Sequence, residues 1–545
     1  MFFLSSKSDE NLGDILEGVA YGSDGLVFYS SGLKEYAASG GDVESLRSGR
    51  FVVKYKKDNY KIIRADKDGN ELIFYYANDD FWCVSSSYLA LIVYLKKNKI
   101  PVIVSKLELS KLFIQTSLFE QPYNDSFSVK GVRLLGKNEK IIISDSLLSI
   151  DRVEDDIEPD GLGVVQRVVK FVQTSRAIIS NFVSNNSVDL ELSGGVDSRI
   201  VLGLVLPYKD EIYISSDKNR RNDYLIAEFI ASLFGIKIRY NSNRNYGVDN
   251  NKKKWGLYKL ANVGISRTNP GPNSGSGTRF SKLVRLNGAG GGSGKVFYNV
   301  NEKAYLSLIE KSPLHEAHKN NLKEDFLMVL RRIGFEKSPP RAMVRLYADY
   351  RQRLFAGRAW YTSLLGVIYS PMNDIGFQSI LKAPDICEVF NASLNEILEK
   401  NLLSLFILCM LDESLPLIRF DEKNKDFDID DVRKMFEIVK PYKSLISGNS
   451  MPVGAVYGEV RSDVIYPDWL EEYFSEYIVD GRVYDDFLYN DICGLVSGLR
   501  ELGLIESSFL DRLEIKILNK ELNRSEKLMC LHLAETLKLA DGFCD

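Results

Sequence analysis

The feature that most constrains the fold is an alternation of helical and strand patterns that begins near residue 160. A segment with apolar residues at helical spacing, "GLGVVQRVVKFVQTSRAIISNFV", precedes the short strand pattern "VDLEL" and a second helical segment. The strand pattern "EIYISS", the helical pattern "DYLIAEFIASLFGI" and the strand pattern "KIRYNS" follow. Strands that alternate with helices predict a parallel, doubly wound α/β sheet.

The residues before this alternation have a different pattern. Short β-type segments such as "GLVFYSSG" and "GRFVVKYKKDNYKIIRADKDGNELIFYY" are separated by turn signals, and one helical pattern, "SYLALIVYLKKN", follows them. We therefore expect a hairpin-rich antiparallel domain over residues 1–155 and a second domain over 160–545. The second domain is expected to contain a long loop region, 264–294, and to be mainly helical beyond about residue 300.

Composition excludes several classes of protein. The chain has 545 residues, 45% of them hydrophobic, with a formal net charge of −4, and this near balance predicts neither a nucleic-acid partner nor a membrane partner. The six cysteines show no metal-ligand spacing. The N-terminal segment does not resemble a secretory signal, and the longest apolar run, "LLSLFILCML", is too short for a membrane span. We expect a cytoplasmic protein.

The turn between the strand "VDLEL" and the next helix carries the clearest candidate site. In a parallel sheet such a turn faces the ligand crevice, and the helix that follows begins with unpaired N–H groups that attract anions. The aspartate would repel phosphate unless a cation such as Mg²⁺ lay between them. An ordinary serine-capped helix start is the alternative interpretation. The candidate residues are Leu192, Ser193, Gly194, Gly195, Asp197 and Ser198.

The full "LSGGVDS" segment resembles the SGGxDS pyrophosphate loop of the N-type ATP pyrophosphatases, and in particular the asparagine synthetase family with its β-lactam synthetase and lasso-peptide cyclase branches. The resemblance implies ATP and Mg²⁺ as cofactors and adenylation of a substrate carboxylate. It also implies an N-terminal glutaminase-like, Ntn-type β-sandwich of the α+β class. An α/β synthetase domain similar to the adenine-nucleotide α-hydrolases, with a parallel sheet and a helical C-terminal part, would follow it.

Weaker matches extend along the chain. Asp223 precedes a predicted helix where the family has an acidic residue, and with Asp197 it is a candidate metal ligand. The segment "AWYTSLLGVIYSPMNDIGF" resembles the family segment that ends in a Pro-Phe-Leu-Asp type turn, with Pro371 and Asp374 at the matching positions. Lys425, with Lys423 beside it, stands in "LPLIRFDEKNKDF" near the position of the family's catalytic lysine.

Two departures from the family pattern affect the expected chemistry. Position 2 is Phe2, where a working glutaminase of this type has a cysteine nucleophile, and the nearest cysteine is Cys83. We therefore expect no glutamine hydrolysis, so the amine would be ammonia or a molecule that carries its own amino group.

The second departure lies in "LNGAGGGSGK", which resembles the family's second glycine loop. Its candidate nucleotide-binding residues are Gly288, Gly290, Gly291 and Lys295. Ala289, Gly292 and Ser293 stand where the family has carboxylates, so metal binding would depend on Asp197, on another acid such as Asp217 or Asp223, or be lost.

These observations predict an ATP-dependent ligase that adenylates a small-molecule or peptide carboxylate and joins it to an amine in an amide bond. One alternative is a nucleotide-binding or regulatory protein of the same fold without catalysis. Another is a lasso-type macrolactam cyclase that acts on a precursor peptide together with a protease partner.

Overall fold

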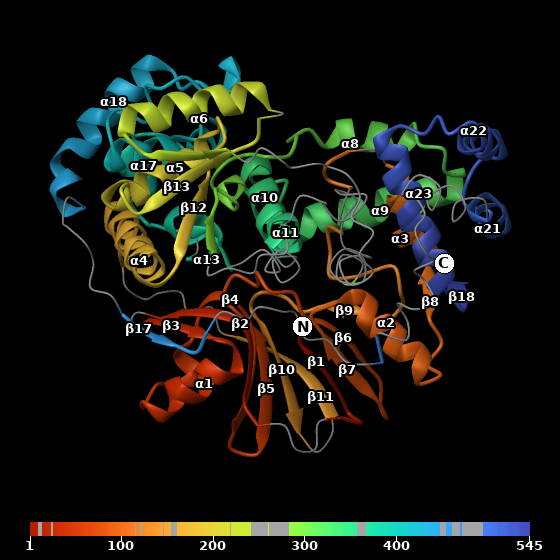
Figure 1. The fold of residues 1–545 in the computed structure, drawn as a ribbon. Helices are drawn as coiled ribbons and strands as arrows, with labels where there is room; N and C mark the ends of the chain where they lie inside the picture. Colours follow the sequence, from red (N-terminus) through yellow and green to blue (C-terminus); the bar gives the residue numbers. More distant parts are fainter. Residues whose placement is uncertain are drawn as a thin grey trace.

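The computed structural model gives two sheets to the N-terminal part of the chain and a parallel sheet with helices to the remainder (Figure 1). The residues it describes are 1–8, 13–22, 25–114, 116–119, 122–144, 147–153, 161–218, 220–240, 260, 283–356, 367–375, 377–446, 454–459, 469–470 and 494–544.

The N-terminal part contains a four-stranded and a seven-stranded sheet, with orders β1-β7-β6-β9 and β11-β10-β5-β4-β2-β3-β17. Their strands are antiparallel except for the β3–β17 pair. The elements are β1 (Phe3–Ser5), β2 (Ile15–Gly22), β3 (Gly25–Phe28), α1 (Tyr29–Ala38), β4 (Ser48–Lys57), β5 (Tyr60–Ala65), β6 (Phe74–Ala77), β7 (Trp82–Ser85), α2 (Tyr88–Lys97), β8 (Ile103–Ser105), α3 (Lys106–Lys111), β9 (Arg133–Leu134), β10 (Glu139–Ser144) and β11 (Leu147–Arg152).

Side-chain alternation along the strands explains why these two sheets pack face to face. In β4, Val52 faces a buried cluster shared with Trp82 of β7, whereas the next residue, Val53, faces a second cluster under α1. In β7, Cys83 faces a third cluster under α2. The result is a sandwich with a helix on each outer side, which is the antiparallel architecture expected from the sequence.

The second part is built on a five-stranded sheet with the order β14-β13-β12-β15-β16, in which every pair is parallel. This confirms the predicted parallel α/β sheet. Helices α4, α5 and α6 supply buried apolar residues to its core. The elements are α4 (Val164–Asn185), β12 (Ser187–Glu191), α5 (Val196–Val205), β13 (Ile212–Ser216), α6 (Arg221–Phe234), β14 (Lys237–Tyr240), β15 (Leu283–Leu286) and β16 (Val367–Tyr369).

Helices predominate beyond residue 300. The apolar run "LLSLFILCML", predicted to be a buried helix, forms α17. This helix packs against α5, and its Phe406 is fully buried. The elements are α8 (Glu302–Glu310), α9 (Glu316–Arg332), α10 (Pro339–Leu346), a π-helical turn (Tyr347–Gln352), α11 (Arg353–Ala356), α13 (Pro371–Asp374), α14 (Phe377–Leu381), α15 (Ile386–Phe390), α16 (Leu394–Glu399), α17 (Leu402–Leu411), α18 (Ile429–Val439), β17 (Ala455–Tyr457), α21 (Leu495–Leu502), α22 (Ser507–Leu518), α23 (Arg524–Leu539) and β18 (Gly542–Cys544).

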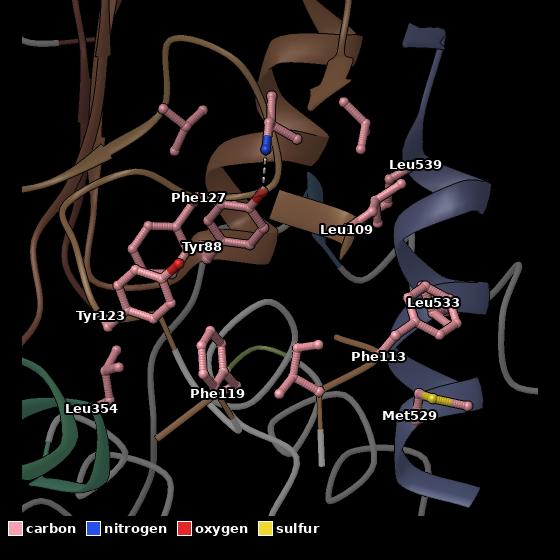
Figure 2. Packing of buried hydrophobic residues seen from close by; sticks show 14 of the residues in the cluster. Tyr88, Leu109, Phe113, Phe119, Tyr123, Phe127, Leu354, Met529, Leu533 and Leu539 are labelled. Carbon is pink, nitrogen blue, oxygen red and sulfur yellow. Dashed lines mark hydrogen bonds between the residues drawn. The ribbon is translucent and has the colours of Figure 1, made fainter. Parts of the chain in front are cut away.

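Late segments of the chain return to the N-terminal part. β17 extends the seven-stranded sheet beside β3, and β18 pairs with β8. Helix α23 buries Met529 and Leu533 in one cluster with Phe113 and Tyr88 (Figure 2). β17 thus adds a strand to the N-terminal sandwich, while β18 and β8 form a separate two-stranded sheet, and α23 packs into the cluster that also covers β7.

None of the helices within the described part of the chain has the length and apolar character needed to cross a bilayer.

Candidate functional site

The "LSGGVDS" turn lies where the strand order of the parallel sheet reverses. From β12 the chain proceeds outward to β13 and then β14, whereas β15 and β16 lie on the other side of β12. The turn leaves the carboxyl end of β12 and leads into α5. In open parallel sheets, ligands bind outside the carboxyl ends of the strands at such a reversal.

Two serines and two glycines shape this turn. The Ser193 amide donates to the Ser198 hydroxyl over 3.2 Å, and the two hydroxyl oxygens lie 3.0 Å apart. The Gly195 amide donates to the Ser193 hydroxyl over 3.3 Å. Both serine side chains thus act within the turn. Gly195 is the N-cap of α5 and no side chain caps this helix, so the start of α5 is not the serine-capped alternative.

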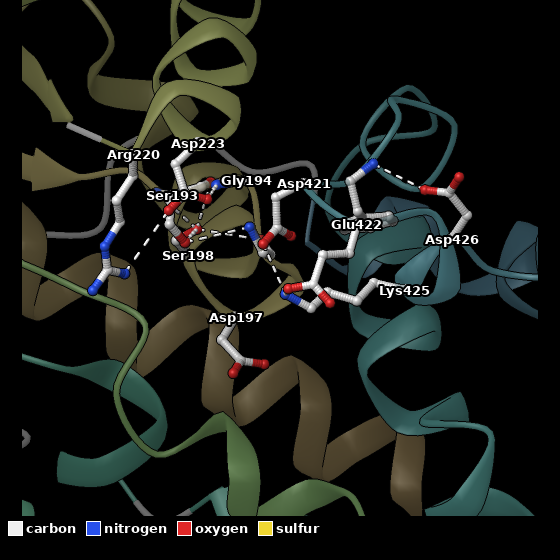
Figure 3. Close-up of polar contacts among 12 residues, drawn as sticks. Ser193, Gly194, Asp197, Ser198, Arg220, Asp223, Asp421, Glu422, Lys425 and Asp426 are labelled. Atoms are coloured by element: carbon white, nitrogen blue, oxygen red, sulfur yellow. Dashed lines mark hydrogen bonds and ion pairs between the residues drawn. The ribbon is translucent and has the colours of Figure 1, made fainter. Parts of the chain in front are cut away.

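The Gly194 amide binds a side-chain carboxylate of the protein itself. It donates to Oδ1 of Asp223, at the start of α6, over 2.8 Å (Figure 3). The carbonyl of Gly194 accepts a hydrogen bond from the Asp421 amide over 3.2 Å. The turn can therefore bind a carboxylate oxygen, and a phosphate oxygen at the same amide would displace Asp223.

The second glycine loop packs directly on the start of α5. A Cβ atom at Gly288 would lie 2.5 Å from the Ser198 amide nitrogen, and one at Gly291 would overlap the Asp197 carboxyl group. Gly290 has a φ of +96°, a conformation that favours glycine. Close approach to the first turn is thus a structural reason for these glycines, alongside the predicted nucleotide contacts.

Asp197 and Lys295 form an ion pair. The Lys295 Nζ lies 2.9 and 3.1 Å from the two carboxylate oxygens, and both side chains are partly exposed. Burial, and then the charge of Asp197, raise the pKa of the Tyr347 hydroxyl to about 12. The structure brings the two predicted site residues together and makes Lys295 the partner of Asp197.

Asp197 and Asp223 could still contribute to a magnesium site. Within the described ranges, no group of three or more His, Cys, Asp or Glu side chains could hold a metal ion. Mg²⁺ is usually held by one or two carboxylates together with substrate phosphates and water. Asp197 and Asp223 supply the carboxylates that a nucleotide-bound magnesium ion would require, and the described residues form no metal cage of their own.

The predicted lysine region lies beside the turn. The Lys425 Nζ is 2.7 Å from Asp421 and 3.1 Å from Glu422. Burial lowers the pKa of Lys425, but these hydrogen bonds outweigh it and the pKa is raised. Lys423 is exposed in the same short 3-10 turn. Lys425 thus forms ion pairs with the acidic segment Asp421–Glu422, whose Asp421 contacts Gly194.

Sequence reasoning missed Arg199, which holds this acidic segment in place. Arg199 is fully buried, and its guanidinium donates to the carbonyls of Leu415, Ile418 and Arg419. It stacks 3.8 Å from the Phe420 ring centroid, and burial lowers its pKa to about 10. The available signal in the sequence was an arginine at the start of the otherwise apolar helical run "RIVLGLVL", where it had to be buried.

A buried polar network joins this region to the N-terminal sandwich. Asp374, at the end of α13, accepts a hydrogen bond from Arg50 Nε of β4 over 2.7 Å. Burial raises the pKa of Asp374 to about 6, although Arg50 opposes the shift. Pro371 begins α13, where its missing N–H costs nothing. Asp374 therefore makes an ion pair that connects two parts of the chain.

The buried carboxyl group of Asp66, near the same network, should make the free energy of unfolding depend on pH. Burial raises the pKa of its carboxyl to about 7 from the ordinary 3.8. A raised folded-state pKa gives stability that is complete below about pH 4 and is lost as the pH rises through about 7. Urea unfolding at about pH 5 and pH 8 should show wild type losing about 2 kcal/mol relative to Asp66→Asn over this range. An unchanged difference would contradict the assignment.

The side chains of Phe2 and Cys83 both lie in the interior of the N-terminal part. Phe2 is buried between the two sheets, and its amide donates to Ser86 Oγ over 3.1 Å. Cys83 is fully buried, and burial raises the pKa of its thiol. Neither residue presents a reactive group to solvent.

Comparison with models of known protein families gives no match, and comparison with curated proteins gives none either. The candidate function therefore depends on the geometry at the ends of the parallel strands.

Proposed function

We propose that this chain is an ATP-dependent ligase that adenylates a carboxylate, releases pyrophosphate and forms an amide bond, like the asparagine synthetases. The observation that carries the proposal is the position of the "LSGGVDS" turn. It leaves β12 at the reversal of strand order, and the Gly194 amide within it already binds a carboxylate oxygen. The N-terminal end of α5 would add favourable partial charge for phosphate.

The residues present suggest how the turn would act. Ser193, Gly194 and Gly195 would hold the β- and γ-phosphates, with Asp223 displaced from the Gly194 amide. A magnesium ion, when bound, would screen Asp197 from the phosphates and stabilise charge on pyrophosphate. Lys295 would be released from Asp197 and become available to a phosphate oxygen.

The reaction would proceed in two balanced steps. A carboxylate oxygen of the substrate attacks the α-phosphorus of ATP, and pyrophosphate leaves as the acyl-adenylate forms. An amine then attacks the acyl carbon and loses a proton, and AMP leaves. Lys425 lies beside Gly194 through Asp421, and this position is compatible with stabilising charge at the α-phosphate.

We further propose that the N-terminal part is a glutaminase-like, Ntn-type sandwich without glutaminase activity. The two packed sheets with an outer helix on each side support this, as does the buried Phe2. The amine would then come from ammonia, a metabolite or a peptide. The substrate could also be a precursor peptide, in which case the protein would act together with a protease partner. We place its action in the cytoplasm.

A second candidate is a nucleotide-binding protein without catalysis. The ion pair between Asp197 and Lys295 favours it, together with Ala289 and Gly292 at positions where the family has acids. Such a protein would bind ATP but would not exchange pyrophosphate.

ATP–pyrophosphate exchange with labelled pyrophosphate separates the two candidates. The intact protein would be assayed with Mg²⁺ and a panel of amino acids, sugar acids and peptides. Exchange that requires one class of carboxylate would support the ligase. ATP binding without exchange for any acid would favour the binding protein, and absence of ATP binding would contradict both.

A further inference from the structure

Three buried residues and the partly buried Asn287 form a continuous hydrogen-bonded network from the N-terminal sandwich to the second glycine loop. Arg50 donates through Nε to Asp374 over 2.7 Å and through Nη2 to the Ser370 hydroxyl over 2.8 Å. The Ser370 amide also donates to Asp374, over 2.8 Å. The Ser370 hydroxyl then donates to Asn287 Oδ1 over 2.5 Å. We call Arg50, Asp374, Ser370 and Asn287 the Arg50 network.

The Arg50 network has few alternative arrangements. Arg50 is 8% exposed, and Asp374 and Ser370 are fully buried. A buried charge that loses its partner is strongly destabilising, because water cannot replace the lost hydrogen bonds. Arg50, which donates to both Asp374 and Ser370, therefore fixes the position of Ser370 relative to β4.

At its other end the Arg50 network fixes the start of the glycine loop. Asn287 directly follows β15, and its Oδ1 also accepts a hydrogen bond from the Ala289 amide over 3.1 Å. A second link from the sandwich supports the same loop. Asn70 donates to the carbonyl of Asn373 over 2.9 Å, and a Cβ at Gly290 would lie 2.8 Å from the Asn373 amide nitrogen.

The glycine loop in turn restricts Asp197. Gly288 contacts the backbone at Asp197 and Ser198 so closely that no side chain fits between them, and Gly291 contacts the Asp197 carboxyl group. Packing this tight transmits a shift of the loop to the first turn of α5. The position of Arg50 and the position of Asp197 are thus connected through contacts without a gap.

We propose that Arg50 is a positioning residue, by which the N-terminal sandwich sets the glycine loop over the "LSGGVDS" turn and thereby sets the affinity for Mg²⁺–ATP. The part about affinity rests on the proposed function. The sandwich would keep this role in a chain that has no thiol nucleophile at position 2. Ser370 is the joint of the Arg50 network, because its hydroxyl is the link between the Arg50–Asp374 pair and Asn287.

Ser370→Ala tests the proposal, since it removes this joint and leaves the Arg50–Asp374 pair intact. Ser404→Ala is the matched control, because Ser404 is also fully buried but its hydroxyl makes no hydrogen bond with the described residues. Both full-length variants would be studied by local hydrogen–deuterium exchange, by thermal unfolding and by calorimetric titration with Mg²⁺–ATP.

We expect Ser370→Ala to speed amide exchange at residues 287–294 about ten-fold or more and to weaken Mg²⁺–ATP binding about ten-fold. Ser404→Ala should do neither, although both variants lose a buried hydroxyl. The proposal would be overturned if amide exchange at residues 287–294 stayed unchanged in Ser370→Ala, or if it rose equally throughout the protein. If wild type fails to bind Mg²⁺–ATP, the proposed function and the claim about affinity are both overturned. The hydrogen–deuterium exchange of residues 287–294 tests the positioning of the loop separately, whether or not ATP binds.

Discussion

Asp197→Ala is expected to reduce ATP–pyrophosphate exchange at least ~100-fold, which corresponds to about 3 kcal/mol of transition-state stabilisation. Asp197 lies in the first turn of α5, beside the reversal of strand order. Its carboxylate is paired with Lys295, so the substitution removes a candidate magnesium ligand and leaves a lysine without its partner. The variant should still fold, because Asp197 is partly exposed.

Asp430→Ala provides a matched control for this substitution. Asp430 also lies in the first turn of a helix, α18, and its side chain is 83% exposed in an ion pair with Arg433. Exchange by this variant should equal that of wild type. Equal activities of wild type and Asp197→Ala would show that the carboxylate has no part in the reaction.

Asp374→Ala is expected to lower the free energy of unfolding by about 3–5 kcal/mol, because it leaves Arg50 buried without its charged partner. Arg50 Nε donates to Asp374 over 2.7 Å, and the Ser370 amide would also lose its acceptor. The pair joins β4 of the N-terminal sandwich to α13. Urea unfolding followed by circular dichroism would measure the loss.

An exposed ion pair within the sandwich gives the comparison. Glu44 pairs with Lys57 over 2.8 Å, and these side chains are 37% and 52% exposed. Glu44→Ala should leave the unfolding midpoint almost unchanged, since solvent replaces an exposed partner. Similar losses for the two substitutions would contradict the structural role assigned to Asp374.

Local patterns were sufficient to predict the two kinds of sheet. Alternating residues such as Val52 and Val53 face opposite clusters, as a period of two requires, and the helical periods around "VDLEL" predict the parallel strands. The turn from Ser193 to Ser198 could be located because glycine and serine between a strand pattern and a helical pattern are typical of a tight turn.

Contacts between distant residues could not be predicted in this way. Arg50 and Asp374 are 324 positions apart, and neither segment indicates that the other contains its partner. The pairing of β17 with β3 and of β18 with β8 depends on tertiary contacts of three-residue strands, which have no pattern of their own. The glycines at 288 and 291 indicated a loop, but only the structure shows that they contact Ser198 and Asp197.

Calorimetric titration of wild type and Gly194→Ala with Mg²⁺–ATP tests the central claim most directly. A Cβ at Gly194 would lie 2.5 Å from the Asp421 Cβ and 3.1 Å from Asp223 Oδ1, so the turn must change shape. At Gly494, by contrast, none of the residues that the structure describes comes within 4 Å of an added Cβ, so Gly494→Ala is the control. We predict saturable binding to wild type and to Gly494→Ala, and binding at least ~10-fold weaker to Gly194→Ala. Equal binding by all three proteins, or no binding to wild type, would contradict the claim that this turn holds the phosphates of ATP.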